Sequence, residues 1–387
     1  MLLTIIIFVL VLSILVFAHE LGHFYTARRF GVRAEEFGLG FPPRVIGWYK
    51  NRSGRWRQVV GGRSVESLET DPDESLQPAP GQTVYSLNAL PIGGFVKIKG
   101  ENGEGKEEPD SFGFQKIWKR IIILSAGVAM NIILAWLLLS VGFMIGLPQA
   151  TDSAGDSAQV RESQVNIVDV LAGSPAERAG IQPGDIVLSI NGQPVATDSE
   201  LQDGVAVAAG QETVLAIRRE GGDTAVTVIP EAAATDQRAT IGVSIFSSGL
   251  VRYPFFAAFW EGAKMTVWLI GEIGRAFSNL FAQIFRGHDV SDQFAGPVGI
   301  ATITGQAARL GFSYLLQFAA LLSLNLAVLN ILPFPALDGG RILFLVIEKI
   351  KGRPVRKEVE AIIHNAGFLL LILLVVFITY KDIIKLF

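Results

Sequence analysis

Four long apolar runs dominate the pattern of hydrophobic and polar positions along the chain. They lie at residues 2–18, 121–147, 314–332 and 367–380. Each run, with its flanks, is long enough as a helix to cross the ~30 Å hydrocarbon core of a bilayer. The pattern predicts an α-helical polytopic membrane protein. We expect its four transmembrane helices within residues 1–30, 118–147, 310–348 and 366–387.

The first apolar run could instead be a secretory signal peptide, which would be removed from the mature protein. It has no basic region at its start. Cleavage after Ala18 would also separate the run from the polar residues that follow it directly. We therefore interpret it as a retained transmembrane helix.

A polar loop, residues 31–117, is expected between the first two helices. Residues 66–81 are rich in Gly, Pro and Glu, which is typical of an exposed loop. Two short alternating runs, 84–87 and 95–98, flank the break Pro-Ile-Gly-Gly at 91–94. This predicts a small β-hairpin at about 84–99, which is either the core of a soluble subdomain or a membrane-associated loop.

Residues 160–235 carry the pattern of an inserted β-rich domain. Alternating runs at 213–217 and 225–229 predict strands. The segment SPAERAGIQPGDIVLSING, 174–192, resembles a bacterial PDZ domain, which implies capture of an extended peptide or a C-terminus by strand addition. A β-rich domain without a ligand is the alternative, because a fold does not fix a function.

Residues 253–287 are apolar enough to suggest a fifth transmembrane helix. However, polar residues recur there on one helical stripe at a period of 3.6: Glu261, Lys264, Glu272, Arg275, Asn279, Gln283 and Arg286. A transmembrane helix would have to bury that stripe. We therefore predict an amphipathic helix at the membrane interface, broken near Gly271 or Gly274. A connection is expected at 349–365.

The composition agrees with a membrane protein. Half of the 387 residues are hydrophobic and only 18% are charged. The formal net charge of −3 gives no reason to expect a nucleic-acid partner. The chain contains no cysteine, so His, Asp and Glu are the available metal ligands.

The basic residues predict the topology. Three clusters flank the apolar runs: Arg28, Arg29 and Arg33; Lys116, Lys119 and Arg120; and Lys349, Lys351, Arg353, Arg356 and Lys357. The positive-inside rule places all three in the cytoplasm, and both termini and the PDZ-like domain outside it. Lys381 and Lys385 argue weakly against this assignment.

The polar cluster at the end of the first run has the spacing of a metal site. His19-Glu20-Leu21-Gly22-His23 fits H-E-x-x-H. On a helix the two imidazoles face the same way and can share one Zn²⁺, while Glu20 can hold the attacking water. The alternative, two solvated histidines at a helix end, is weakened because the flanking residues are apolar.

Catalytic zinc usually has three protein ligands, so one more is expected. His288 and His364 have a suitable side chain but fit local polar roles better. Asp338 in NILPFPALDGG should lie at the same cytoplasmic end as His19 and His23, and is the better candidate. It could also be only a helix cap.

Together these features resemble the site-2 protease family of intramembrane metalloproteases, in particular the bacterial regulators of sigma-E proteolysis. The resemblance rests on HELGH, a small-residue stretch in the second helix, ALPIGGFVKIKGE, the PDZ-like segment, GPVGIA and NILPFPALDGG, and covers nearly the whole chain. It implies zinc bound by His19, His23 and Asp338, with Glu20 as catalytic acid/base. It also implies a bacterial inner-membrane location and substrate binding by Asn330 and by a β-loop that contains Gly93, Gly94 and Phe95.

Two features depart from that family. Its enterobacterial members carry tandem PDZ domains, whereas the space here suits one. The polar residues 51–83 also lengthen the first loop.

The resulting hypothesis is a zinc protease that cleaves single-span membrane proteins, such as anti-sigma factors or signal-peptide remnants. Asn325 and Asn330 would satisfy the backbone groups of the unwound substrate helix. A zinc carrier is an alternative, but it would need ligands along several helices. A PDZ-bearing membrane scaffold is another, but it would not need Glu20.

Overall fold

The computed structural model describes residues 2–384, apart from 63, 104, 106, 152–154, 156, 220–221, 233–238, 289 and 291–294, and without the side chains of 66 and 92. The chain divides into two compact units. The first contains residues 1–139 and 263–387, and the second residues 140–262. Each unit is described by itself.

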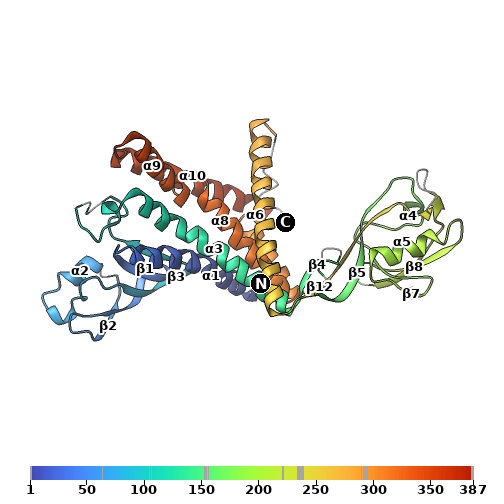
Figure 1. Ribbon diagram of the computed structural model, residues 1–387, viewed down its shortest axis with the longest axis horizontal. Helices are drawn as coiled ribbons and strands as arrows, with labels where there is room; N and C mark the ends of the chain where they lie inside the picture. Colours follow the sequence, from blue (N-terminus) through green and yellow to red (C-terminus); the bar gives the residue numbers. More distant parts are fainter. Residues whose placement is uncertain are drawn as a thin grey trace. The chain divides into compact units, whose positions relative to one another are not determined.

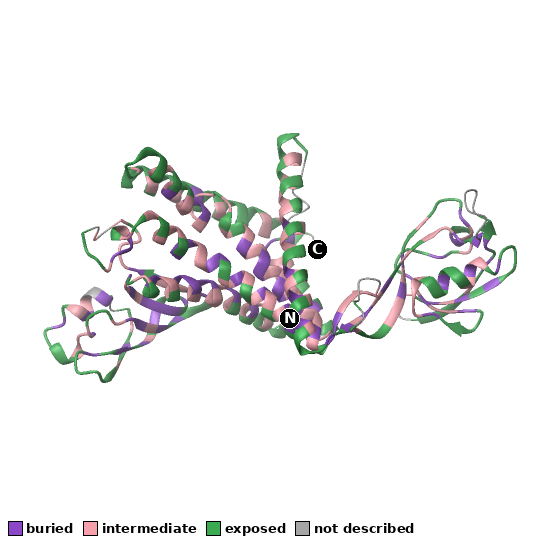
Figure 2. Cartoon of the chain, in the orientation of Figure 1, coloured by how far each residue is buried: buried purple, intermediate pink, exposed green. Residues whose placement is uncertain are grey.

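Four of the described helices are long and apolar enough to cross a membrane (Figure 1). They are α1 (Leu2–Arg29), α3 (Ile117–Ile145), α8 (Phe312–Ile331) and α10 (Lys357–Ile384). Large apolar side chains are exposed along α10, such as Phe368, Leu370 and Phe377. Figure 2 shows exposed and half-buried segments alternating along the long helices. Exposed apolar surface of this extent is typical of a helix in contact with lipid.

The third predicted transmembrane helix, 310–348, is two helices in the structure. α8 ends at Ile331, and α9 (Asp338–Lys351) begins at Asp338. Pro333 and Pro335 lie between them, and a proline lacks the N–H that a helix interior needs. α10 begins at Lys357, so much of the predicted connection 349–365 is helical. Residues 385–387 of the last predicted helix lie outside the described residues.

Two further helices differ from expectation. α6 (Phe255–Phe285) continues through Gly271 and Gly274, so the predicted break is wrong. An isolated glycine costs a helix interior only about 1 kcal/mol, which a helix of this length tolerates. α7 (Pro297–Leu310) was not predicted. The interfacial location of α6 stays a prediction.

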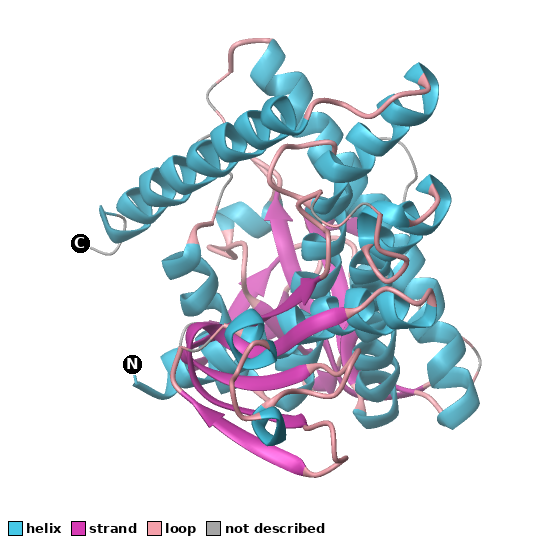
Figure 3. Cartoon of the chain, turned by 90° about the vertical axis from the view of Figure 1, so that its left-hand side faces the viewer, coloured by secondary structure: helices cyan, strands magenta, loops and turns pink. Residues whose placement is uncertain are grey.

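The first loop folds into a three-stranded sheet in the order β2-β1-β3. Its strands are β1 (Ala34–Lys50), β2 (Trp56–Val60) and β3 (Val84–Ile98), and Figure 3 shows strands beside the helices. The predicted hairpin is wrong in its pairing. Leu39 of β1 pairs with both Leu87 and Gly94, so the first half of β1 lies between the two arms of β3. Short helices α2 (Val65–Glu69), η1 (Glu74–Leu76) and η2 (Phe112–Phe114) complete the loop.

Aromatic packing attaches this sheet to α1. The Phe37 ring of β1 lies 5.2 Å from the ring of Phe17 and 4.8 Å from that of Phe24. A second cluster of buried side chains, including Ala27, Ile123 and Leu345, joins α1, α3 and α9. The sheet therefore lies against the helix that carries the HELGH motif.

The second unit is rich in strands around one apolar core. Its main sheet has the order β4-β12-β5-β6-β8-β9, with β7 paired to β6, and β10 pairs with β11. The strands are β4 (Leu147–Ala150), β5 (Gln159–Val170), β6 (Ile186–Ile190), β7 (Gln193–Pro194), β8 (Thr213–Arg219), β9 (Gly222–Val228), β10 (Glu231–Ala232), β11 (Ala239–Thr240) and β12 (Val243–Arg252). Two short helices, α4 (Pro175–Arg178) and α5 (Asp198–Ala206), accompany them.

The Gly-Asp turn of this unit is fixed by a buried carboxylate. Asp185 accepts hydrogen bonds from Arg219 Nε at 2.7 Å and from the Gln182 amide at 2.9 Å. The hydrogen bonds from Arg219 hold the pKa of Asp185 below its usual range. The turn therefore keeps a charged carboxylate, which joins β6 to β8.

Candidate metal centre

Three buried or half-buried side chains converge at one point of the first unit. His19 Nε2 and His23 Nε2 lie 3.1 Å apart. Asp338 Oδ2 lies 3.0 Å from the first and 3.3 Å from the second. Among the described residues, this is the group of His, Asp and Glu side chains whose donor atoms are close enough to share a metal ion. Two nitrogens and one oxygen form a donor set that suits zinc.

The local sequence explains how the donors meet. His19 and His23 are one helical turn apart, so they lie on the same face of α1. Asp338 is the first residue of α9, directly after the proline break. A Cβ at Gly339 would lie 2.1 Å from the Leu332 carbonyl oxygen, so only glycine allows this chain path into α9.

The contacts of both histidines at Nδ1 leave their Nε2 atoms available to a metal. His23 Nδ1 donates to the Ile123 carbonyl at 2.8 Å, so its Nε2 carries a lone pair. His19 Nδ1 lies 3.3 Å from the Asn131 amide nitrogen, while the buried Asn131 Oδ1 has no hydrogen-bond partner. With its amide rotated by half a turn, Asn131 would accept a hydrogen bond from His19 Nδ1–H at Oδ1. The residues present therefore fit a zinc ion.

Two glycines allow α1 and α3 to approach each other at this point. A Cβ at Gly22 would lie 2.3 Å from the Ala126 carbonyl oxygen. A Cβ at Gly127 would lie 2.4 Å from His23 Nε2 and 2.6 Å from His19 Cε1. The small residues noted in the second apolar run therefore make room for the imidazole rings.

Glu20 lies between the metal centre and the edge of the sheet. Its Oε2 accepts a hydrogen bond from the Val96 amide at 3.0 Å. Val96 pairs with Phe37 on its other side, so this N–H belongs to the outer edge of β3. A Cβ at Gly94 would lie 2.9 Å from the Gly38 carbonyl oxygen, and 3.9 Å from Glu20 Cγ. The glycine lets the strand pass close to the carboxylate.

Ser13 holds the bend of β3 against α1, a role that the sequence analysis missed. Its Oγ donates to the Pro91 carbonyl at 2.9 Å and accepts from the Gly93 amide at 3.4 Å. Gly93 has φ of +79°, and a Cβ there would lie 3.0 Å from Val16 Cγ1. A lone serine inside an apolar run was the available signal.

A cavity of about 230 Å³ opens beside the metal centre. Its lining residues are Val16, His19, Glu20, Asn131, Leu326, Asn330, Ala336, Leu337 and Asp338. Asn330 thus lines the cavity beside the metal cluster, and its side chain makes no hydrogen bond to another described residue. Asn325 does not line the cavity, because its amide donates to the Leu321 carbonyl of its own helix at 2.9 Å.

The remaining candidates lie apart from the cluster. Phe95 lines a separate cavity of about 340 Å³ along the edge of β3. His288 is exposed beyond the end of α6. His364 accepts a hydrogen bond at Nδ1 from the Ala336 amide at 2.9 Å.

Comparison with known proteins decides the family. The sequence profile of peptidase family M50 matches residues 7–60 and 76–374. The chain belongs to peptidase family M50. It is accordingly a zinc metallopeptidase of the site-2 protease type and an integral membrane protein.

Several relatives are similar over nearly their whole length. The regulator of sigma-W protease RasP of Bacillus subtilis is 30% identical over 99% of this chain and 99% of its own. A protein of Agrobacterium fabrum, provisionally named a zinc metalloprotease, is 31% identical over 97% of this chain and 94% of its own. One of Clostridium perfringens with the same description is 32% identical over 97% of both chains.

One solved structure, the PDZ domain of an SdrC-like protein from Listeria monocytogenes, can be superposed on part of this M50 chain. The match covers 22% of this chain and 92% of the Listeria chain. Its TM-score is 0.21 and its identity 17%, which is too distant to support an argument. The PDZ assignment therefore stays a prediction from the sequence.

Proposed function

We propose that this chain cleaves single-span membrane proteins within or near the membrane, with zinc held by His19, His23 and Asp338. The observation that carries the proposal is the convergence of three donor atoms within 4.8 Å of one another, with Glu20 one residue from His19. This cluster forms where α1, long and apolar enough to cross a membrane, meets α9. Zinc there would supply Lewis-acid polarisation of the scissile carbonyl.

Glu20 acts as the catalytic acid/base. Its carboxylate takes a proton from the attacking water as the oxygen–carbon bond forms, and returns the proton to the leaving amine as the peptide C–N bond breaks. The hydrogen bond from Val96 orients one carboxylate oxygen and leaves the other free. The products are two shortened peptides.

The edge of β3 presents the substrate. A peptide bond in a transmembrane helix is protected because its carbonyl is hydrogen-bonded and no water is near, so the helix must unwind first. The outer edge of β3 at Gly94–Val96 can take an unwound segment as an added strand, next to Glu20. Asn330, with an amide that bonds to no other described residue, satisfies a freed backbone group across the cavity.

The proposed substrates are supported by the relatives, and the proposed membrane topology is supported by the basic clusters. RasP is named as a regulator of sigma-W. We propose that the substrates of this chain are likewise anti-sigma factors, or else signal-peptide remnants. We place the chain in a bacterial cytoplasmic membrane, with both termini and residues 160–235 outside the cytoplasm. The metal centre would lie toward the cytoplasmic side.

The strand-rich unit is proposed to act as a single PDZ domain that binds an extended peptide or a C-terminus. Its support is the sequence SPAERAGIQPGDIVLSING, with the Asp185 turn and an antiparallel sheet around one core. Binding of extended peptides to the full chain in detergent would test this assignment.

The zinc-carrier and scaffold alternatives have less support. The ligand group found among the described residues is a single cluster, formed by α1 and the start of α9, whereas a carrier needs ligands along a path. A scaffold gives no reason for a carboxylate between the cluster and a strand edge. The family supports a peptidase.

Purified protein in detergent should cleave a single-span model substrate, lose that activity with a zinc chelator, and regain it when zinc is added. Asp338→Ala should lower bound zinc because it removes one of three donors. Zinc per chain and peptide products by mass spectrometry are the measurements. A folded Asp338→Ala protein with full zinc would remove this residue from the site, and zinc flux without cleavage would favour a carrier.

Asn330→Ala should leave zinc content and thermal stability nearly unchanged, because this side chain makes no hydrogen bond to another described residue. It should reduce cleavage of a helical substrate by about 10-fold, the effect of one lost charge-free hydrogen bond. A substrate with Gly or Pro near the cut should be partly spared, since less unwinding must be stabilised. Asn325→Ala is the matched control, because that amide bonds within α8. Equal losses with both substrates would argue against a role in unwinding.

A further inference from the structure

The loop before Asp338 has an unusual backbone at Ala336. This alanine has φ of +76°, in the left-handed region that residues with a Cβ rarely adopt. A residue in this conformation persists only when the surroundings hold it there. Ala336 is two residues before Asp338, so its conformation sets where the Asp338 carboxylate points.

Helix α10 holds this loop at two points. The Ala336 amide donates to His364 Nδ1 at 2.9 Å. One turn further along α10, Gly367 lies directly against the loop, because a Cβ there would be 2.4 Å from Pro335 Cβ. His364 thus provides the hydrogen bond, and Gly367 provides the close approach.

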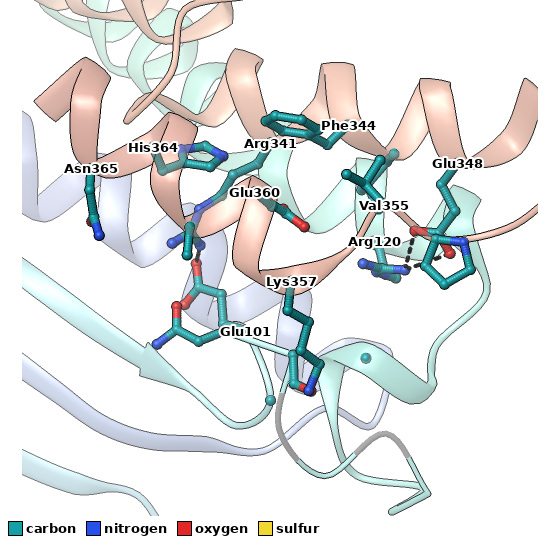
Figure 4. A pocket seen from close by; sticks show the side chains of 17 residues that line it. Glu101, Arg120, Arg341, Phe344, Glu348, Val355, Lys357, Glu360, His364 and Asn365 are labelled. Atoms are coloured by element: carbon teal, nitrogen blue, oxygen red, sulfur yellow. Dashed lines mark hydrogen bonds and ion pairs between the residues drawn. The ribbon is translucent and has the colours of Figure 1, made fainter. Parts of the chain in front are cut away.

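His364 has a polar ring atom that packing does not explain. Figure 4 shows it beside Phe344 and Arg341 in the wall of a cavity of about 390 Å³. The His364 and Phe344 ring centroids are 5.4 Å apart. Since Nδ1 accepts a hydrogen bond, Nε2 carries the proton, and this buried atom has no partner among the described residues. A buried donor without a partner is unfavourable, so an apolar ring would suit this place better.

We propose that His364 is a positioning residue for the metal centre, acting through the Ala336 amide to fix Asp338. The inference rests on the proposed role of Asp338 as a ligand. Residues that orient a ligand from outside typically change metal affinity 10- to 100-fold when they are lost. His364 would do so through the backbone of the loop, without touching the metal.

The test compares two substitutions in the full chain in detergent. His364→Phe keeps a ring against Phe344 but removes the acceptor, so zinc should bind about 10- to 100-fold more weakly. Its melting temperature should change little, because removal of the unpartnered Nε2–H offsets the lost hydrogen bond from the Ala336 amide. His364→Asn places an amide oxygen near the position of Nδ1 and should restore zinc affinity. Chelator competition gives the affinities, and the absorption spectrum of the cobalt-loaded protein reports the coordination geometry.

A second variant separates loop position from helix packing. Glycine adopts positive φ without the steric cost of a Cβ, so Ala336→Gly added to His364→Phe should recover part of the zinc affinity. His364→Leu is a second acceptor-free variant if His364→Phe does not fold. Wild-type affinity in the acceptor-free variants, or an equal loss with Phe and Asn, would overturn the inference. Wild-type protein without zinc, or Asp338→Ala with full zinc, would instead contradict the proposed function.

Discussion

Glu20→Gln should lower the rate of substrate cleavage by about 10²- to 10⁴-fold, the usual contribution of a general acid/base. Glutamine cannot take the proton from the attacking water. The zinc content should not change, because Glu20 is not among the three side chains with converging donor atoms. The glutamine oxygen can still accept the hydrogen bond from Val96, so β3 should keep its place. Single-turnover cleavage and zinc per chain are the measurements.

Glu272→Gln is the matched control. It makes the same chemical change in a carboxylate on α6 that pairs with Arg275, three residues along the same helix. Its cleavage rate should equal that of the wild type. A Glu20→Gln protein that cleaves at the wild-type rate would assign the proton transfer to another group, and one that loses zinc would show a structural role for Glu20.

The parts of the site that the sequence predicted depend on local geometry. The spacing of His19 and His23 fixes their shared face on any helix. Two prolines and two glycines around Asp338 predict a helix break and a new helix start, although the predicted span 310–348 ignored that consequence. The family resemblance added Asn330, which lines the cavity, whereas Asn325, named because an unwound substrate backbone needs hydrogen-bond partners, does not.

The sheet was missed because its pairing is non-local. β1 contains Gly38, Gly40 and the pair Pro42-Pro43, which normally argue against a strand. β1 bends there, and both of its halves pair with the first arm of β3, since Leu39 and Ile46 both pair with Leu87, so no alternation runs through the whole strand. Both arms of β3 were found because they alternate, but their partner could not be read from their own residues.

Hydrogen bonds made by backbone groups also could not be predicted from the sequence. The Val96 amide that meets Glu20, the Ala336 amide that meets His364, and the Ile123 carbonyl that meets His23 carry no side-chain signature. These contacts depend on which helices pack together. They orient the acid/base, the loop before Asp338 and one imidazole, so the chemistry of the site depends on packing that only the fold reveals.

Gly127→Ala should abolish tight zinc binding, with an affinity loss of about 100-fold or more, because the new methyl group displaces two ligands at once. A Cβ at this position would lie 2.4 Å from His23 Nε2 and 2.7 Å from His19 Nε2. The rings cannot simply move away, since α1 and α3 already touch where a Cβ at Gly22 would lie 2.3 Å from the Ala126 carbonyl oxygen. Overpacking of this kind costs about 1–3 kcal/mol. Chelator competition and thermal unfolding measure the two effects.

Gly274→Ala separates this steric effect from helix propensity. Both glycines lie inside long helices, but a Cβ at Gly274 meets no atom within 4 Å. That substitution should leave zinc affinity unchanged and raise stability by up to about 1 kcal/mol, since alanine favours helix more than glycine does. The gain in propensity is the same at both positions, so a loss of zinc at Gly127 alone must come from the imidazoles. If Gly127→Ala instead bound zinc like the wild type, the two helices would be able to separate without disturbing the ligands, and the close crossing would not be needed to form the metal centre.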